Sequence, residues 1–208
     1  MKKLLALALL AALIPLGIAC GDDNDEADVP DAATSAPATS TAIATAEPDA
    51  CADPDSTEPT PAFKGGTDPV EGPAPAVPPL ATLTDVRYAC HEDFDRIAFD
   101  FEDNLPGYTV EYVEPPIVQD GSGEPVGIEG AAFLKVVFNT AQAHDDAGNS
   151  TYTGPREITP GLDSVSEMEM AGDFEGYVTW GIGLPEELDF RVTPLEDPFR
   201  AVIDIAHP

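Results

Sequence analysis

Basic residues are scarce in this chain of 208 residues: nine lysines and arginines stand against 39 aspartates and glutamates, and the formal net charge is −30. Proteins that bind nucleic acid, anionic lipid or teichoic-type polymers depend on basic patches that release counterions from the polyanion. The composition therefore argues against these partners, and we expect no nucleic-acid function. Solubility, including in a salty environment, is the ordinary explanation of such acidity.

Motifs of known catalytic sites are also missing. The sequence contains no Gly-x-Ser-x-Gly elbow, no His-Glu-x-x-His pair and no glycine-rich phosphate loop. His91, His144 and His207 lie far apart, in predicted turns or at the carboxyl terminus, so no metal site is predicted. Carboxylates are too numerous for a catalytic pair to be singled out. We expect a protein that is not an enzyme and needs no cofactor, with a carboxylate-based hydrolase as an alternative.

No apolar run reaches the roughly 20 residues that span a bilayer. The longest, Leu4 to Ile14, follows Lys2 and Lys3 and precedes a short segment of mostly small residues that ends at Ala19. This order of basic, apolar and small residues predicts an export signal over residues 1–19.

The end of this segment resembles the signal of bacterial lipoproteins, in which a cysteine after a small residue receives a diacylglyceryl group and an acylated amino terminus. The resemblance implies that Cys20 is the lipid attachment site and that the exported chain is anchored to the membrane on its extracytoplasmic side. Gly17 departs from the family pattern, which has an apolar residue three positions before the cysteine. A secreted protein with an ordinary cleavage site, or an uncleaved anchor, is the alternative.

Large apolar residues are rare between Gly21 and Pro79, where Ala, Asp, Glu, Pro, Ser and Thr dominate. Such a segment buries too little surface to offset the entropy lost on ordering. We therefore expect residues 20–79 to be a disordered acidic linker that holds a domain away from the membrane.

The chain has only three cysteines. With Cys20 assigned to lipid, Cys51 and Cys90 remain and are predicted to form a disulfide in an oxidising compartment. This disulfide would close a loop of 39 residues, which the chain-entropy model values at about 4 kcal/mol. Two free thiols are the alternative.

Helical periodicity is missing beyond Leu80, where short apolar or alternating runs are separated by Gly, Pro, Asp and Asn. This pattern is typical of an all-β domain. We expect a two-sheet β-sandwich over residues 80–208, with at most one or two helical turns near Pro185 to Leu188. Strands are predicted at residues 85–90, 96–101, 108–113, 131–138, 165–170, 174–184, 190–193 and 200–205.

An internal repeat relates two of these strands. Residues 96–101 and 200–205 share the pattern Arg-x-x-apolar-Asp-apolar. With the period of two of a strand, the apolar residues face one way and the Arg and Asp residues the other. The repeat predicts two equivalent strands that contribute to a shared core. By the same alternation Trp180 belongs to the core, whereas Tyr177 faces the opposite way.

The repeated strands, together with Pro106-Gly107-Tyr108, the segment 173–176 and the closing segment 198–204, resemble the AMIN-like domain of bacterial lipoproteins, which is related to the AMIN module of cell-wall amidases. The resemblance covers residues 82–206. It implies a β-sandwich in the cell envelope that binds peptidoglycan or another envelope protein.

Basic residues of the predicted domain fall mostly on the outward face of strands. These basic residues are Arg87, Arg96, Lys135, Arg191 and Arg200. The ordinary explanation of their position is that they pair across strands with acids such as Asp100, Asp204 and Glu111. The functional alternative is that Arg96 and Arg200 grip a ligand carboxylate, as on a peptide stem. Tyr177, with Tyr108 or Tyr112, is a candidate for stacking on a sugar ring.

Two acid clusters suggest a different function. Residues 92–95 contain Glu92, Asp93 and Asp95, and Asp145-Asp146 lie near Asn149; both clusters offer oxygen ligands for calcium. Neither has the regular spacing of a known calcium loop, and solvated turns are the ordinary interpretation. A cation-dependent adhesion or structural module is therefore a further alternative.

Overall fold

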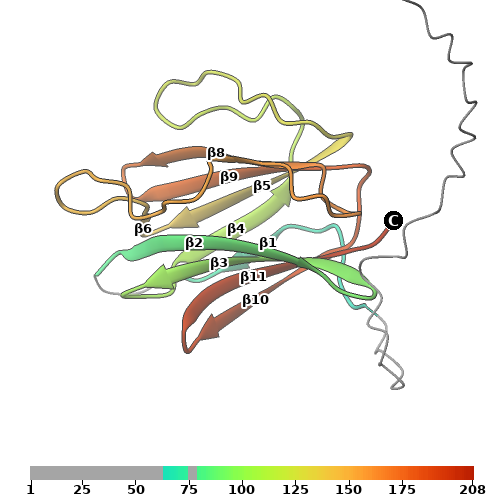
Figure 1. Ribbon diagram of the computed structural model, residues 1–208, viewed down its shortest axis with the longest axis horizontal. Coiled ribbons are helices and arrows are strands. Elements are labelled where there is room, and N and C mark those ends of the chain that lie inside the picture. The colour runs from blue at the N-terminus through green and yellow to red at the C-terminus, as the bar shows by residue number, and fades with distance from the viewer. Residues whose placement is uncertain (1–62, 75–78) are drawn as a thin grey trace, which may run out of the picture. The chain divides into compact units, whose positions relative to one another are not determined.

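The structure, a computed structural model, describes residues 63–74 and 79–208, which form two β-sheets packed face to face (Figure 1). Within this part of the chain there is no helix, and so none long and apolar enough to cross a membrane. The strands are β1 (Val70–Gly72), β2 (Ala81–Cys90), β3 (Phe94–Glu102), β4 (Gly107–Tyr112), β5 (Ala132–Asn139), β6 (Ala141–Gln142), β7 (Glu157–Ile158), β8 (Glu167–Phe174), β9 (Tyr177–Leu184), β10 (Phe190–Glu196) and β11 (Phe199–Ala206).

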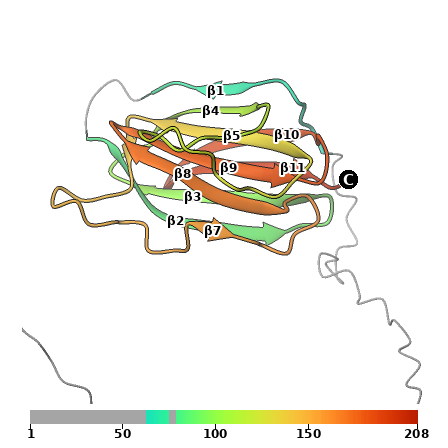
Figure 2. The same ribbon diagram turned by 90° about the horizontal axis from the view of Figure 1, so that it is seen from above.

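The larger sheet has six strands in the order β1-β4-β5-β9-β8-β7, and the smaller has five in the order β10-β11-β3-β2-β6. Neighbouring strands are antiparallel except for β2 and β6, which are parallel. Figure 2 shows the two layers from above. The predicted all-β, two-sheet sandwich is confirmed.

The core lies between the sheets and is built around aromatic rings. Phe99 of β3 packs edge-on against Phe138 of β5 and Trp180 of β9, with ring centroids 4.9 and 5.7 Å apart. Tyr152 completes the cluster against Trp180 at 5.6 Å. These contacts join both sheets and stabilise them beyond simple area burial, by about 0.5–1.5 kcal/mol per ring pair. Trp180 is fully buried, as predicted.

The two copies of the repeat are direct neighbours in the smaller sheet. Strands β3 and β11 run antiparallel in a register that places Arg96 opposite Asp204 and Arg200 opposite Asp100. Because the motif has Arg and Asp four residues apart, antiparallel pairing matches each Arg with the Asp of the other copy. The repeat thus specifies the register of this strand pair.

The segment between β4 and β5 folds over the outer face of the larger sheet and forms a second small core with Ala171 of β8 and Phe133 of β5 (Figure 1). Ile128 lies against Gly181, and the Glu129 carbonyl oxygen lies where a side chain at Gly183 would be. Alternating glycines on the outer side of β9 therefore let this segment approach the sheet backbone.

The domain begins earlier than the sequence predicted. Strand β1 pairs with β4, and Gly66 exchanges backbone hydrogen bonds with Phe190 of β10. Phe63 packs against Phe94, and the Arg191 guanidinium lies 4.7 Å from the centroid of the Phe63 ring. The prediction of a linker is thus wrong for residues 63–74, because backbone pairing and one aromatic anchor compensate for the low apolar content. Residues 1–62 and 75–78, with Cys20 and Cys51, lie outside the described residues.

Smaller differences concern individual strands. The predicted strand 174–184 is divided by a tight turn at Glu175 and Gly176, which have positive φ angles of 50° and 82°. The short strands β6 and β7 were not predicted, because two-residue strands carry no periodicity. The segment 185–188 contains no helical turn.

Candidate functional site

The outer face of the five-stranded sheet gathers most of the arginines of the domain. Strand alternation places Arg87 of β2, Arg96 of β3, and Arg200 of β11 on this face, and Arg191 of β10 lies opposite Asp204. Asp100 and Asp204 lie among them. Asp85 lies opposite Asp100. This face therefore holds four arginines and three acids, whereas the whole chain has 39 acids and only nine basic residues.

Asp204 is held between two arginines. Arg96 donates from Nε to Oδ1 at 2.6 Å and from Nη2 to Oδ2 at 2.9 Å, and Arg191 donates from Nε to Oδ2 at 2.9 Å. Burial of Asp204 opposes its ionisation, but the hydrogen bonds from Arg96 and Arg191 outweigh this and lower its pKa. The hydrogen bond to Asp204 raises the pKa of Arg96. This trio is a structural network in which both oxygens of the Asp204 carboxylate are occupied.

Arg200 has no such partner. The Asp100 carboxylate opposite it accepts two hydrogen bonds from Arg87, at 2.6 and 2.8 Å. The Arg200 Nε lies 3.9 Å from Asp100 Oδ1, and this buried nitrogen has no hydrogen-bond partner among the described residues. A buried donor without a partner is uncommon in native proteins and calls for an explanation. Arg200 therefore has a donor on this face that the described residues leave without a hydrogen bond.

The arginines border a groove of about 550 Å³. Its floor is formed by short side chains, because Ala98 lies between Val202 and Arg87 in the strand register and Ala89 lies opposite Arg96. Long side chains around short ones leave the hollow. It is lined by Val86, Tyr88, Ala89, Ala98, Val202 and Leu195 together with Arg87, Arg96 and Arg200. The site thus combines guanidinium groups with a small apolar surface.

The structure brings Arg96 and Arg200 into this one groove but places Tyr177 elsewhere. Tyr177 lies on β9 of the other sheet and is half exposed. Tyr108 is buried in the core, and the Tyr112 hydroxyl donates to the Leu188 carbonyl at 2.7 Å and accepts from the Leu188 amide at 2.8 Å. Of the three tyrosines considered for sugar stacking, Tyr177 is the one with an exposed ring.

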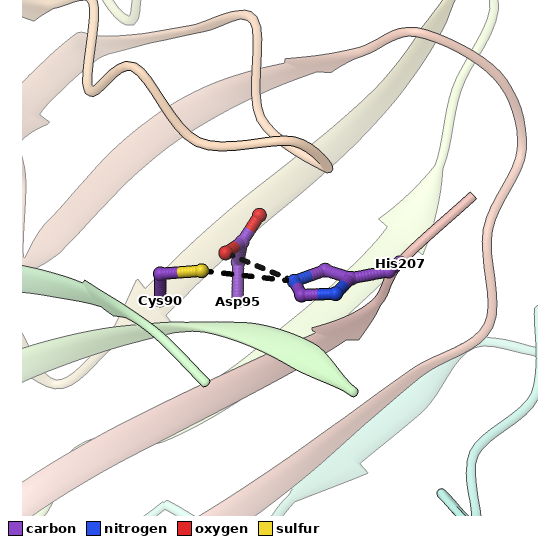
Figure 3. Close-up of side chains that lie close together, drawn as sticks. All are labelled: Cys90, Asp95 and His207. Atoms are coloured by element: carbon purple, nitrogen blue, oxygen red, sulfur yellow. Dashed lines mark hydrogen bonds and ion pairs between the residues drawn. The ribbon is translucent and has the colours of Figure 1, made fainter. Parts of the chain in front are cut away.

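A second group of polar side chains, which the sequence did not reveal, lies at one end of the smaller sheet (Figure 3). Cys90 ends β2, Asp95 is the second residue of β3 and His207 follows β11. His207 Nε2 lies 3.3 Å from Asp95 Oδ1 and 4.0 Å from Cys90 Sγ. Asp95 is fully buried and also accepts a hydrogen bond from the Ser164 amide at 2.7 Å. The pairing of β2, β3 and β11 explains this convergence.

Cys90, Asp95 and His207 offer one sulfur, one oxygen and one nitrogen within 4.8 Å of one another. Such a donor set suits zinc when the sulfur is a thiolate. The disulfide predicted between Cys51 and Cys90 uses the same sulfur. The disulfide and the metal site therefore exclude each other.

The acid clusters do not assemble open cation sites in the structure. Asp95 points into the protein, apart from the exposed Glu92. The Asp145 carboxylate accepts hydrogen bonds from the Asn149 side chain and from the amides of Asn149 and Ala147, and these bonds, that of the Asn149 side chain first, lower its pKa. Its oxygens serve the turn of residues 145–149, as in an Asx turn.

Three glutamates that the sequence did not single out lie close together at the edge of the larger sheet. Glu157 of β7 is the cross-strand partner of Glu169 of β8, and Glu167 lies two residues away on the same strand. Desolvation, followed by the charges of Glu157 and Glu167, raises the pKa of Glu169. Glu167 is occupied, since it accepts a hydrogen bond from the Glu129 amide at 2.6 Å.

Comparison with known proteins gives one match. A family model described as the AMIN-like domain matches residues 81–207. Neither the curated proteins nor the solved structures contain a match to this chain. The match covers both sheets from β2 onward and includes the arginine groove.

Proposed function

The chain belongs to the AMIN-like domain family, and on that premise we propose that it is a non-catalytic binding protein of the bacterial cell envelope whose sandwich binds carboxylates of peptidoglycan peptides. In this proposal Cys20 carries the lipid that holds the protein at the extracytoplasmic side of the membrane. The acidic residues that follow act as a spacer between the membrane and the domain.

The observation that carries the proposal is the Nε of Arg200, which lies in the groove and has no hydrogen-bond partner among the described residues. Arginine binds carboxylates through two parallel hydrogen bonds, and such charge-assisted bonds are about twice as strong as neutral ones. Asp100 is engaged by Arg87, so a carboxylate from outside would complete the hydrogen bonding of Arg200. Arg87 and Arg96, which also line the groove, add positive charge.

The groove floor favours a small apolar group next to that carboxylate. Ala89, Ala98, Val202 and Leu195 supply apolar surface beside the guanidinium groups. A peptide that ends in a small apolar residue with a free carboxylate matches both features. Peptidoglycan carries such peptides, whereas a bulky or polar end group would leave the apolar floor uncovered.

A peptide titration tests the carboxylate directly. The full mature chain is titrated by calorimetry with a short peptide ending in alanine, either as the free acid or as the carboxy-terminal amide. We expect the acid to bind at least tenfold more tightly than the amide, the equivalent of about 1.4 kcal/mol. Arg200→Ala should remove this preference, and Arg200→Lys should retain only part of it, because lysine lacks the planar fork.

Lys64→Ala is the matched control, since Lys64 is exposed and lies outside the groove. It should bind the acid as the unaltered chain does. Equal binding of acid and amide, or unchanged binding by Arg200→Ala, would exclude the groove as a carboxylate site.

Cosedimentation with purified cell-wall sacculi tests the cellular partner. The chain should sediment with sacculi at low salt, and Arg200→Ala should sediment less. Retention should fall as salt rises, because surface charges are screened. If the unaltered chain stays in solution at every salt concentration while the peptide acid still binds, the partner is another envelope component with a free carboxylate and not peptidoglycan.

A further inference from the structure

The outer face of the six-stranded sheet carries two exposed aromatic residues at neighbouring positions. Phe174 ends β8 and Tyr177 begins β9, and they are direct cross-strand partners in the antiparallel register. Their exposed fractions are 49% and 50%. The turn that joins them consists of Glu175 and Gly176, whose positive φ angles define a tight two-residue hairpin. The backbone therefore places both side chains as neighbours on one surface.

A hollow of about 290 Å³ adjoins these rings. Lys135 and Val137 of β5 and Thr179 of β9 line it from the sheet. Asp120 and Gly121 line it from the segment that folds over β8 (Figure 1). The hollow thus has an aromatic wall, a hydroxyl, an ammonium group and a carboxylate.

Asp120 is placed by contacts that hold its backbone close to the sheet. Its amide donates to the Ala171 carbonyl at 3.1 Å, and its side chain lies against Gly172, where any larger residue would displace it. The Asp120 Oδ2 is buried and has no hydrogen-bond partner among the described residues. Because buried carboxylate oxygens are normally paired, this oxygen is an acceptor in need of a donor.

These groups suit a neutral sugar better than an ion or a peptide. Asp120 and Glu175 outweigh the single Lys135, so an anion is repelled. A small cation would leave most of the two exposed ring faces uncovered, whereas a ligand with a flat apolar surface would cover them. A pyranose ring has an apolar C–H face for an aromatic side chain and a rim of hydroxyls that donate to carboxylates and accept from ammonium groups.

We propose that Phe174, Tyr177, Asp120 and Lys135 form a sugar-binding site for a neutral glycan residue. One ring stacks on the apolar face of the sugar, a sugar hydroxyl donates to the Asp120 carboxylate, and the Lys135 ammonium donates to a sugar oxygen. That the natural ligand is a cell-wall glycan rests on the proposed function. The site itself is inferred from the two aromatic residues and the hollow beside them. It lies on the opposite sheet from the arginine groove.

The test is a titration of the full mature chain with the soluble tetramer of N-acetylglucosamine, followed by backbone amide NMR. Shifts should concentrate at residues 120–121, 135–137 and 174–179. Tyr177→Ala and Phe174→Ala should each weaken binding at least tenfold, whereas Tyr177→Phe should retain most of it because the ring remains. Asp120→Ala should weaken binding severalfold.

Two control variants separate this site from the groove. Tyr88→Ala removes an exposed tyrosine of β2 in the other sheet, and Arg200→Ala disables the proposed carboxylate site. Both should bind the tetramer as the unaltered chain does. Thermal melts of Tyr177→Ala and Phe174→Ala should show that these exposed positions do not affect folding.

The proposal is overturned if millimolar tetramer causes no shifts, or if both aromatic variants bind it as well as the unaltered chain. Loss of tetramer binding in Arg200→Ala would overturn it too, since the sugar would then lie in the groove. Tetramer binding with no preference for the peptide acid would retain this site and reject the carboxylate proposal, so the two failures are distinguishable.

Discussion

Arg96 and Asp204 face each other across β3 and β11, with Arg96 Nε 2.6 Å from Asp204 Oδ1 and only 1% of the Asp204 side chain exposed. The second copy of the repeat supplies the reciprocal contact, Arg200 opposite Asp100, but at 3.9 Å. One copy of the motif thus closes a paired network while the other leaves its arginine available. The two Arg–Asp pairs of the repeat thus have different roles. The Arg96–Asp204 pair stabilises the fold, and in our proposal Arg200 binds a ligand.

Replacing Asp204 should destabilise the protein in a pH-dependent way. The pKa of Asp204 is lowered in the folded state, so its ionised form stabilises the fold above its ordinary pKa of 3.8, and this contribution is lost as the pH falls below that value. Asp204→Asn should lower the free energy of unfolding by about 2 kcal/mol at pH 7. The difference from the unaltered chain should shrink below pH 4.

Urea unfolding between pH 2.5 and 7 measures this effect. Glu102→Gln, which alters an exposed acid at the end of β3, is the control and should have little effect at any pH. A loss for Asp204→Asn that is the same at pH 3 and pH 7 would show that the carboxylate charge is not its origin.

Glycine on the outer side of β9 should be indispensable where the backbone of the covering segment approaches. A side chain at Gly183 would collide with the Glu129 carbonyl group, whereas one at Gly181 would meet mainly the end of the flexible Ile128 side chain. We expect Gly183→Ala to cost about 2–3 kcal/mol of unfolding free energy and Gly181→Ala less. Gly127→Ala, with open space around it, is the matched control. Thermal denaturation that ranks Gly181→Ala as the more harmful would contradict this packing.

Sequence periodicity was sufficient for the sandwich and for most of its long strands. The alternation in residues 96–101 and 200–205 assigned the outward arginines and inward apolar residues correctly, and the pairs Arg96–Asp204 and Arg87–Asp100 confirm the expected cross-strand contacts. Strand β1 was missed because Val70–Gly72 has no alternation to detect, and its pairing with β4 is a tertiary property.

The candidate site could be predicted only in part, for a similar reason. Strand alternation indicates which residues share a face, but not which of two sheets a strand joins. Arg200 and Tyr177 both point outward, yet β11 and β9 belong to different sheets. The orphaned Arg200 Nε and Asp120 Oδ2 depend on where neighbouring side chains lie, and no sequence pattern encodes that.

The disulfide and the metal site at Cys90 make opposite predictions. If Cys51 and Cys90 are joined, the oxidised mature chain should weigh two hydrogens less than the reduced chain, and reduction should lower the free energy of unfolding by about 2–4 kcal/mol. Cys51→Ser should reproduce that loss. Tight zinc binding by the oxidised chain, measured by calorimetry, would contradict the assignment of this sulfur to a disulfide.

Lipidation at Cys20 should determine where the protein is found. In a bacterial host with the lipoprotein pathway, the mature product should begin at residue 20, carry the mass of the lipid and fractionate with membranes. Cys20→Ala should abolish the added mass and release the chain from the membrane fraction. An unacylated amino terminus on the native product, by mass spectrometry, would support the secreted alternative.

Glu169 should be a site where removal of a charge stabilises the fold. Its pKa is raised above the ordinary 4.5 by desolvation and then by Glu157 and Glu167. The folded state therefore binds this proton more tightly than the unfolded state, and stability falls as the pH rises from 4.5 through the folded pKa. Because the side chain is partly exposed, Glu169→Gln should raise the free energy of unfolding by only a few tenths of a kcal/mol at pH 7.

The gain should disappear well below pH 4.5, where the glutamate is protonated in both states. Glu71→Gln on β1, an exposed acid apart from the three glutamates, controls for the general effect of lowering a net charge of −30. If Glu71→Gln stabilises the protein as much as Glu169→Gln does in urea unfolding at pH 7, repulsion among all the acids, and not the local cluster of glutamates, explains the gain in stability. If Glu169→Gln is less stable than the unaltered chain at pH 7, the cluster stabilises the edge of the sheet, and the raised pKa of Glu169 is refuted.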